Sequence, residues 1–259
     1  MSEGLRIYNL LPTLAGPVER WAEALPRIAD MAFNAIYLNP FHYPGFSGSI
    51  YAVKDYYRLN PHLRGKSRAS DDDLLRAFTE AAAHHGLRVI MDLVVNHTAK
   101  DSPLTAERPH WFAREPDGRL HSPFATDPAD PSQKTVWGDL AEIDYRRPQR
   151  DEIVAYFEQL VRHYVGLGFG GFRCDAAYKV PAAVWRRLIG AAKSAAPDTL
   201  FLAETLGAPF EEVLALDSAG FDYLFNSVKW WDFESGWLLE QYERFRLIAP
   251  SIGFPESHD

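Results

Sequence analysis

Five charged side chains stand near the ends of short apolar runs in this sequence: Asp92, Arg173, Asp175, Glu204 and Asp259. If these runs are parallel strands of one barrel, their carboxyl ends meet at a single mouth and bring the five groups together. Carboxyl groups that share a mouth suit the cleavage of a glycosidic bond. One must donate a proton to the leaving oxygen, while another attacks the sugar or activates water.

The surroundings of each carboxyl group indicate a role for it. Arg173 comes two residues before Asp175 and faces the same side of its strand, so it would keep that carboxylate ionised, as a nucleophile requires. A neighbouring carboxylate raises the proton affinity of Glu204 and suits it to act as the acid. A third carboxylate, Asp259, can bind sugar hydroxyls and stabilise the positive charge of the transition state. Taken singly, each of these groups could instead be structural.

Short apolar runs alternate with stretches of helical period along the chain, which predicts parallel strands joined by crossover helices. We expect seven strands, at about residues 5–11, 35–38, 87–95, 170–174, 200–203, 221–225 and 251–255. We expect helices at about 18–28, 71–85, 150–165, 182–193, 210–216 and 236–245. Pro26 should kink the first helix or split it in two. The sequence therefore predicts an α/β fold, a TIM (β/α)8-type barrel that is truncated after strand seven.

Two long stretches interrupt the alternation. Residues 39–68 are expected to be a loop, and residues 98–147 are rich in Pro, Asp and Ser and lack a regular period. A long insertion in a compact domain is usually a functional loop or subdomain. We therefore expect a barrel domain over 1–97 and 148–259, with an inserted loop or small domain over 98–147 between strand three and helix three.

No eighth strand and helix follow in the sequence. We therefore expect these residues to be a fragment whose missing partner is a C-terminal segment of the same chain. An unclosed barrel leaves unpaired edges on strands one and seven, so the 259-residue piece alone is expected to be poorly stable and weakly active.

The composition argues against several classes of protein. With 259 residues, 47% of them hydrophobic, the chain can bury the core of one large domain. The net charge of −8 and the lack of a basic block argue against a nucleic-acid partner. Cys174 has no second cysteine to pair with, and the sequence shows neither a signal-peptide pattern nor an apolar run of about 18 residues. We expect a cytoplasmic protein with no membrane partner.

The same residues resemble the four ordered motifs of glycoside hydrolase family 13, the α-amylase family. Segments 92–97, 171–175, 201–204 and 254–259 resemble these motifs in the family's order. Segment 50–57 resembles the loop whose tyrosine stacks on the sugar at the bond being cleaved. The resemblance runs from one end of the chain to the other, and four ordered motifs are highly specific.

The resemblance implies a retaining enzyme that cleaves the α-1,4-glucosidic bonds of an α-glucan or maltooligosaccharide through a covalent glycosyl-enzyme intermediate. It implies that Asp175 is the nucleophile, Glu204 the acid/base and Asp259 the stabiliser. The substrate contacts it implies are those of Tyr51, His97, Arg173, Lys179 and His258. The supporting residues it implies are Asp55, Asp92 and Asn96.

The chain departs from the family pattern in two places. α-Amylases usually have a Lys-His pair where this chain has Tyr178 and Lys179, so hydrolysis of starch does not follow from the motifs. The fourth motif usually has Asn where Ser257 stands. No cofactor is required for the chemistry, but many amylases hold a structural calcium ion, and the resemblance implies Asn96 and Asp139 as its ligands.

Three alternatives to a hydrolase remain open. Segments 108–112 and 116–118 resemble a stretch of the bacterial maltosyltransferases that use maltose 1-phosphate, so a maltosyl- or glucanotransferase of the same family is the first. A non-catalytic carbohydrate-binding relative is the second, and it should have lost a catalytic carboxylate. An unrelated barrel enzyme that binds Mg²⁺ through strand-end acids is the third, and it has no use for Arg173 so close to an acid.

Overall fold

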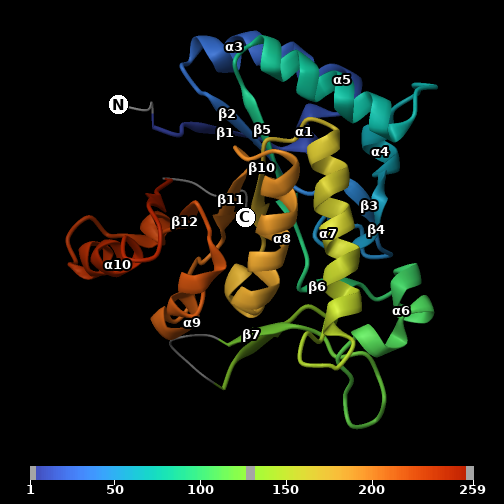
Figure 1. The fold of residues 1–259 in the computed structure, drawn as a ribbon, viewed down its shortest axis with the longest axis vertical. Helices are drawn as coiled ribbons and strands as arrows, with labels where there is room; N and C mark the ends of the chain where they lie inside the picture. The colour runs from blue at the N-terminus through green and yellow to red at the C-terminus, as the bar shows by residue number, and fades with distance from the viewer. Residues whose placement is uncertain (1–3, 127–131, 255–259) are drawn as a thin grey trace.

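One sheet of parallel strands organises the computed structural model, which describes residues 4–126 and 132–254 (Figure 1). The strands follow one another across the sheet in chain order: β1 (Ile7–Leu10), β2 (Ala35–Leu38), β5 (Arg88–Leu93), β10 (Gly171–Cys174), β11 (Leu200–Ala203), β12 (Tyr223–Phe225) and β13 (Ser251–Ile252). All six pairings are parallel. The predicted α/β fold is confirmed: the sheet is seven strands of a (β/α)8-type barrel.

Helices α5 (Asp71–His84), α7 (Arg150–Gly166) and α8 (Ala182–Ala195) lie over the outer face of the sheet (Figure 1). The other helices of the described residues are α1 (Pro12–Ala15), α2 (Val18–Trp21), α3 (Leu25–Asp30), α4 (Pro61–Arg64), α6 (Pro103–Glu107), α9 (Phe210–Leu214) and α10 (Trp237–Phe245). The predicted helix over 18–28 is split, because Pro26 occupies the first turn of α3 and cannot continue the preceding turn. No helix in the described parts of the chain is both long and apolar enough to cross a bilayer.

The start and end of α5 illustrate how the sequence sets an element. The hydroxyl of Ser70 accepts a hydrogen bond from the backbone N–H of Asp73 at 3.1 Å. The negative charges of three acidic residues in the first turn interact favourably with the positive end of the helix dipole. Gly86 follows the helix with a φ of +70°, a left-handed conformation that costs glycine little. Leu75 and Phe78 are buried on the face of α5 toward the sheet.

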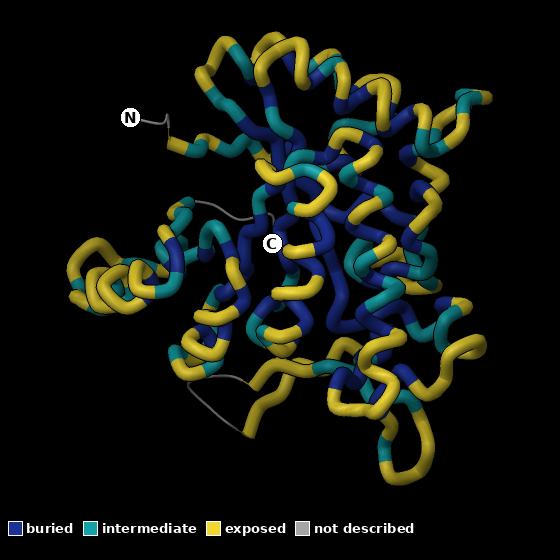
Figure 2. Tube along the Cα trace, viewed as in Figure 1, coloured by how far each residue is buried: buried dark blue, intermediate teal, exposed yellow. Residues whose placement is uncertain are grey.

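The central strands are buried (Figure 2). Side chains alternate between the two faces of the sheet, and this alternation positions the site. Met91 on β5, Phe172 on β10 and Phe201 on β11 belong to the large core between sheet and helices. Their neighbours therefore face the barrel interior, where Tyr37 and Leu202 pack in a small second cluster. By the same alternation the side chains at positions 92, 173 and 204 point inward.

The expectation of a plain loop over 39–68 is wrong. The stretch contains an antiparallel hairpin, β3 (His42–Pro44) and β4 (Val53–Leu59), followed by α4. The register of this hairpin shifts twice within three residues, so the sequence shows no regular alternation of polar and apolar residues.

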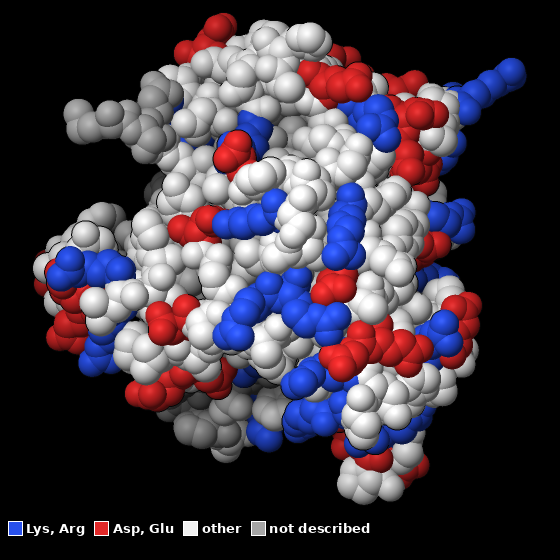
Figure 3. All heavy atoms as spheres, in the orientation of Figure 1, with Lys and Arg blue, Asp and Glu red and all other residues white. Residues whose placement is uncertain are grey.

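Residues 98–147 contain short antiparallel pairs. Strand β6 (His97–Ala99) pairs with β9 (Leu140–Glu142), and β7 (Phe124–Thr126) pairs with β8 (Lys134–Val136). The first pair brings the end of the stretch back to its start, beside the carboxyl end of β5. Side chains of both charges are interspersed over the face that Figure 3 shows.

Candidate active site

Arg173 links two carboxylates at the mouth of the barrel. It lies opposite Asp92 in the pairing of β10 with β5, and its Nη1 lies 2.9 and 3.1 Å from the two oxygens of that carboxylate. The same nitrogen donates to Oδ1 of Asp175 at 2.7 Å. The structure thus brings together three of the predicted site residues, and the guanidinium offsets the repulsion between two nearby negative charges.

Tyrosine hydroxyls hold the other side of Asp92. Tyr37 and Tyr51 both donate to its Oδ2, the second at 2.9 Å. The amide nitrogen of Asn39 lies 3.3 and 3.4 Å from the two hydroxyl oxygens, and Asn9 donates to Oδ1 of Asn39 at 2.8 Å. Tyr37, Asn39 and Asn9 were not predicted from the sequence, although Tyr37 occupies an alternate, inward position of a predicted strand.

Asp92 is fully buried, and burial raises its pKa to about 6. Arg173 opposes this rise and the charge of Asp175 reinforces it. Asp92 is thus held by four hydrogen bonds and points away from solvent. This placement suits the supporting role that was expected for it rather than direct attack on a substrate.

Glu204 follows β11, the strand next to β10. Its carboxylate accepts two backbone N–H groups, from Ala176 at 2.9 Å and from Leu206 at 2.7 Å. Burial raises the pKa of Glu204, and the negative charge of Asp175 adds to this rise. The rise is opposed by Arg173, whose Nη2 lies 3.9 Å from the Glu204 carboxylate, and by the two backbone N–H donors. A carboxyl group with a raised pKa beside an arginine-bound carboxylate is the pairing that acid/base chemistry at neutral pH needs.

A left-handed residue separates the two carboxyl groups. Ala176, directly after Asp175, has a φ of +42°, which is uncommon for a residue with a Cβ. The next N–H, of Ala177, donates to the carbonyl of Glu204 at 3.1 Å, and the indole of Trp185 donates to the carbonyl of Ala177 at 2.9 Å. These hydrogen bonds stabilise the left-handed conformation of Ala176. The chain turns away from β10 at this residue, while the N–H groups of Ala176 and Ala177 bind Glu204 at the end of β11.

Tyr51 and His97 lie against the same cluster. The guanidinium carbon of Arg173 is 5.9 Å from the centre of the Tyr51 ring. Nε2 of His97 lies 3.2 Å from the backbone oxygen of Tyr51. His97 is buried, and burial lowers the pKa of its imidazole, although the negative charge of Asp175 acts to raise it. Nδ1 of His97 has no hydrogen-bond partner among the described residues, so the ring keeps a polar atom for a ligand or water.

Two predicted residues lie outside this cluster. The carboxylate of Asp55, on β4, accepts the N–H of Tyr57 at 2.9 Å. Nζ of Lys179 lies 3.1 Å from Oε2 of Glu212 and 4.8 Å from the centre of the Tyr178 ring. Neither side chain has a hydrogen bond or ion pair with the carboxyl groups of the cluster.

The fourth motif is only partly described. Phe254 is its last described residue, and its ring meets Phe225 edge-on at 5.6 Å. Asp259 and His258, the predicted stabiliser and its neighbour, lie outside the described residues.

The predicted calcium ligands lie beside β6. Asn96 is buried and its Oδ1 has no hydrogen-bond partner among the described residues, whereas Oδ2 of Asp139 accepts the hydroxyl of Ser47 at 2.5 Å. An unsatisfied buried amide oxygen is of the type that calcium binds. Over residues 4–126 and 132–254, however, no three His, Cys, Asp or Glu side chains form a group that could hold a metal ion.

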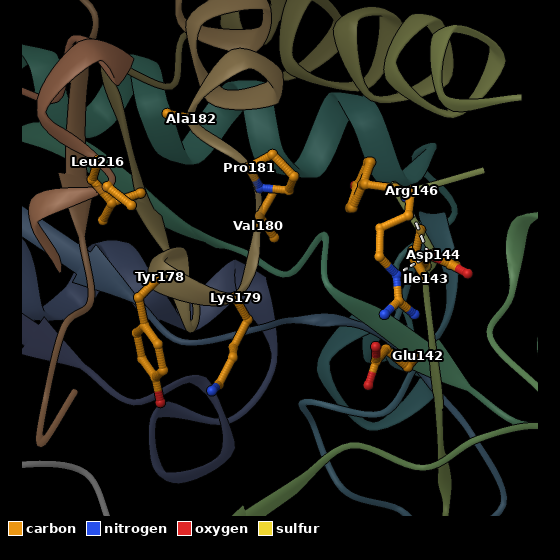
Figure 4. Close-up of a pocket in the computed structure, with 12 residues that line it drawn as sticks. Glu142, Ile143, Asp144, Arg146, Tyr178, Lys179, Val180, Pro181, Ala182 and Leu216 are labelled. Atoms are coloured by element: carbon orange, nitrogen blue, oxygen red, sulfur yellow. Dashed lines mark hydrogen bonds and ion pairs between the residues drawn. The ribbon is translucent and has the colours of Figure 1, made fainter. Parts of the chain in front are cut away.

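A cavity of about 320 Å³ lies at the turn that follows β10 (Figure 4). Its walls come from the end of β9 and the following residues, from the turn after β10, and from the end of α9. The lining residues include Glu142, Asp144, Arg146, Tyr178, Lys179 and Leu216. None of the three clustered carboxyl groups lines it.

Comparisons with known proteins agree with the motifs. The family described as "Glycogen debranching enzyme, glucanotransferase domain" matches residues 1–113. The alpha-1,4-glucan:maltose-1-phosphate maltosyltransferase of Burkholderia pseudomallei is 26% identical over 98% of this chain and 22% of its own length. The enzyme of the same name from Myxococcus xanthus is 29% identical over 81% of this chain and 32% of its own length. The chain thus spans between a fifth and a third of the length of these relatives.

Solved structures share the fold. An alpha-amylase from Lactobacillus plantarum superposes with a TM-score of 0.76 at 25% identity, covering 96% of this chain and 61% of its own. A maltogenic alpha-amylase from Thermotoga neapolitana gives a TM-score of 0.75 at 24% identity, over 98% of this chain and 60% of its own. Its ordered motifs, its sequence relatives and its fold are thus all similar to those of the α-amylase family of enzymes, glycoside hydrolase family 13.

Proposed function

We propose that this protein cleaves α-1,4-glucosidic bonds with retention of configuration and passes the glycosyl group to a sugar acceptor. The observation that carries the proposal is the contact of one guanidinium, that of Arg173, with the carboxylates of Asp92 and Asp175, while Glu204 lies 3.9 Å away. This arrangement supports the proposal because it gives one arginine-bound carboxylate and one buried carboxyl group at adjacent strand ends, the two groups that double displacement uses.

In the proposed reaction the Asp175 carboxylate attacks the anomeric carbon while protonated Glu204 gives its proton to the leaving oxygen. The C–O bond breaks, and the glycosyl group becomes an ester of Asp175. Ionised Glu204 then takes the proton of an acceptor hydroxyl, whose oxygen attacks the anomeric carbon and releases Asp175. Asp259 is proposed to stabilise the positive charge that develops on the sugar in both steps.

The names of the relatives support a sugar acceptor over water. The sequence relatives are named as maltosyltransferases, which favours a sugar acceptor. Hydrolysis, with water as acceptor, is the second candidate, because the structural neighbours include alpha-amylases and a cyclic alpha-maltosyl-(1-->6)-maltose hydrolase. The two reactions share the first half and differ only in what attacks the ester.

Product analysis separates them. The protein is incubated with maltose 1-phosphate and, separately, with soluble starch, each with and without an added maltooligosaccharide. We expect products longer than the added oligosaccharide, formed only when it is present. Shorter sugars alone, in amounts that the added oligosaccharide does not change, would instead establish hydrolysis. No product from either donor would overturn the proposed function.

We further propose that Asn96 and Asp139 contribute to a structural calcium site, which the unsatisfied Oδ1 of Asn96 supports. Calcium should raise the melting temperature of the wild type and not that of Asn96→Ala, with Asn226→Ala as the matched control. An equal response of all three proteins to calcium and to a chelator would contradict this site.

A further inference from the structure

The turn between β3 and β4 carries Tyr51, whose hydroxyl donates to Oδ2 of Asp92 at 2.9 Å. This turn covers residues 45–52, and its own backbone closes it, since the N–H of Gly45 donates to the carbonyl of Ala52 at 2.8 Å. Tyr51 comes directly before Ala52 in the turn. The position of its hydroxyl therefore depends on where the whole turn lies.

One carboxylate, that of Asp101, binds this turn at both ends. Its Oδ1 accepts a hydrogen bond from the backbone N–H of Phe46 at 3.3 Å, at the start of the turn. Its Oδ2 accepts a hydrogen bond from Nζ of Lys54 at 2.7 Å, on the strand that follows the turn. Tyr51 lies between these two contacts along the chain. Asp101 itself belongs to the stretch 98–147, so the contacts join two segments that are far apart in the sequence.

The contact between Asp101 and Lys54 acts locally. Burial acts to raise the pKa of Asp101, but the hydrogen bonds from Lys54 and from the N–H of Phe46 hold it below its ordinary value. The carboxylate is therefore ionised at neutral pH, and hydrogen bonds to an ionised group are stronger than neutral ones. The side chains of Lys54 and Asp101 are 34% and 31% exposed, so solvent weakens their attraction. The pair thus contributes little to the stability of the whole fold and more to the position of the turn.

The turn also packs closely on β6. Ala52 is fully buried beside Ala99 of β6 and Leu140 of β9. A Cβ atom at Gly45 would stand 2.4 Å from Cβ of Ala99 and 2.6 Å from Oδ1 of Asp101, so the backbone would have to shift to make room for it. Glycine permits this close approach, and the turn lies directly on the segment that leads to Asp101.

We propose that Asp101 is a positioning residue for Tyr51: by binding both ends of the turn, it holds the tyrosine hydroxyl on Asp92. This inference rests on the proposed function, since the position of Tyr51 affects a rate only if the carboxyl groups near it take part in a reaction. Asp92 shares the guanidinium of Arg173 with Asp175. A displaced hydroxyl therefore changes the hydrogen bonding of this carboxylate pair, and small displacements near reacting groups lower rates by large factors.

Matched substitutions of two aspartates test this assignment. Asp101→Ala removes both contacts with the turn, whereas Asp117→Ala removes an ion pair and a backbone contact of the same kinds, both with Arg119, elsewhere in the stretch 98–147. Rates are measured with maltose 1-phosphate and a maltooligosaccharide acceptor. We expect Asp101→Ala to lower kcat/KM about tenfold and the melting temperature by less than about 4 °C. Asp101→Asn, which keeps an oxygen for the N–H of Phe46, should lower kcat/KM about threefold, and Asp117→Ala should match the wild type.

A double-variant cycle shows whether Asp101 acts through Tyr51. In the Tyr51→Ala background there is no hydroxyl left to position, so the addition of Asp101→Ala should lower kcat/KM by less than about twofold. Similar losses from Asp101→Ala in both backgrounds would overturn the role, because Asp101 would then act by another route. Equal rates for Asp101→Ala and Asp117→Ala would overturn it as well.

Hydrogen exchange separates this inference from the proposed function. The amides of residues 45–52 should exchange faster in Asp101→Ala than in the wild type, and Asp117→Ala should leave their exchange unchanged. Faster exchange, with a wild type that converts no donor, would leave the turn fixed by Asp101 and remove the proposed function. Unchanged exchange and unchanged rates in Asp101→Ala, with an active wild type, would do the reverse.

Discussion

Nη1 of Arg173 lies 2.7 Å from Oδ1 of Asp175, a carboxylate two residues further along the chain. Both side chains leave the strand end on the same face, and Arg173 is itself fixed by Asp92 on the next strand. The orientation of the Asp175 carboxylate is therefore set by a contact between strands rather than by the loop that follows it.

Replacing Asp175 with Ala should lower turnover of every donor by about a thousandfold or more, because no ester can form without the carboxylate. Initial rates with maltose 1-phosphate and with starch measure the effect. Asp198→Ala, at an exposed aspartate on the surface, should keep wild-type rates. Substantial turnover by Asp175→Ala would show that another group is the nucleophile.

Glu204→Gln should slow donors whose leaving group needs a proton far more than a glycosyl fluoride, whose leaving group departs without one. Since burial raises the pKa of Glu204, the wild-type rate with a glucan donor should persist to higher pH than an ordinary glutamate would allow and then fall. Rates over pH with both donors test this. Equal losses with both donors would contradict the acid role.

Arg173→Met should destabilise the fold by about 3–5 kcal/mol, because it leaves Asp92 buried without its charged partner. The Arg173 side chain is 8% exposed, and Asp92 is 0% exposed. Urea unfolding measures the loss. Arg246→Met, whose side chain is 53% exposed and pairs with Glu243, should cost less than about 1 kcal/mol. Similar losses in the two variants would mean that the buried contact contributes no more than a surface pair.

The sequence predicted the positions of β2 and β11 to the residue, because each is a run of four apolar residues bounded by polar ones. It also identified Asp92, Arg173, Asp175 and Glu204, since strand ends in a parallel sheet share one edge. It could not show that Tyr37 and Asn39 complete the cluster, because their hydroxyl and amide groups are common in cores. Nor could it show that Lys179 pairs with Glu212, a contact set by how α9 packs on the turn η3 (Ala177–Lys179).

The stability contributed by Asp92 should fall as the pH rises. Burial raises its pKa to about 6 in the folded protein, against about 3.9 in an unfolded chain. Between these values the native state keeps a proton that the unfolded state has released. The contribution is therefore complete below about pH 4 and is lost as the pH rises through about 6.

Asp92→Asn isolates this effect, since asparagine does not titrate. The difference in free energy of unfolding, wild type minus variant, should decrease between about pH 4 and pH 6 and then level off. Urea unfolding across this range checks it. A difference that increases with pH would show that Arg173 depresses the pKa of Asp92 below its unfolded value.

The left-handed conformation of Ala176 makes one peptide unit common to two carboxyl groups. That unit follows Asp175 directly and gives its N–H to Glu204. A displacement of the unit therefore moves both groups at once, and the spacing of the pair cannot be adjusted through one of them alone. Changes that alter one carboxyl group and spare the other must begin beyond this bend.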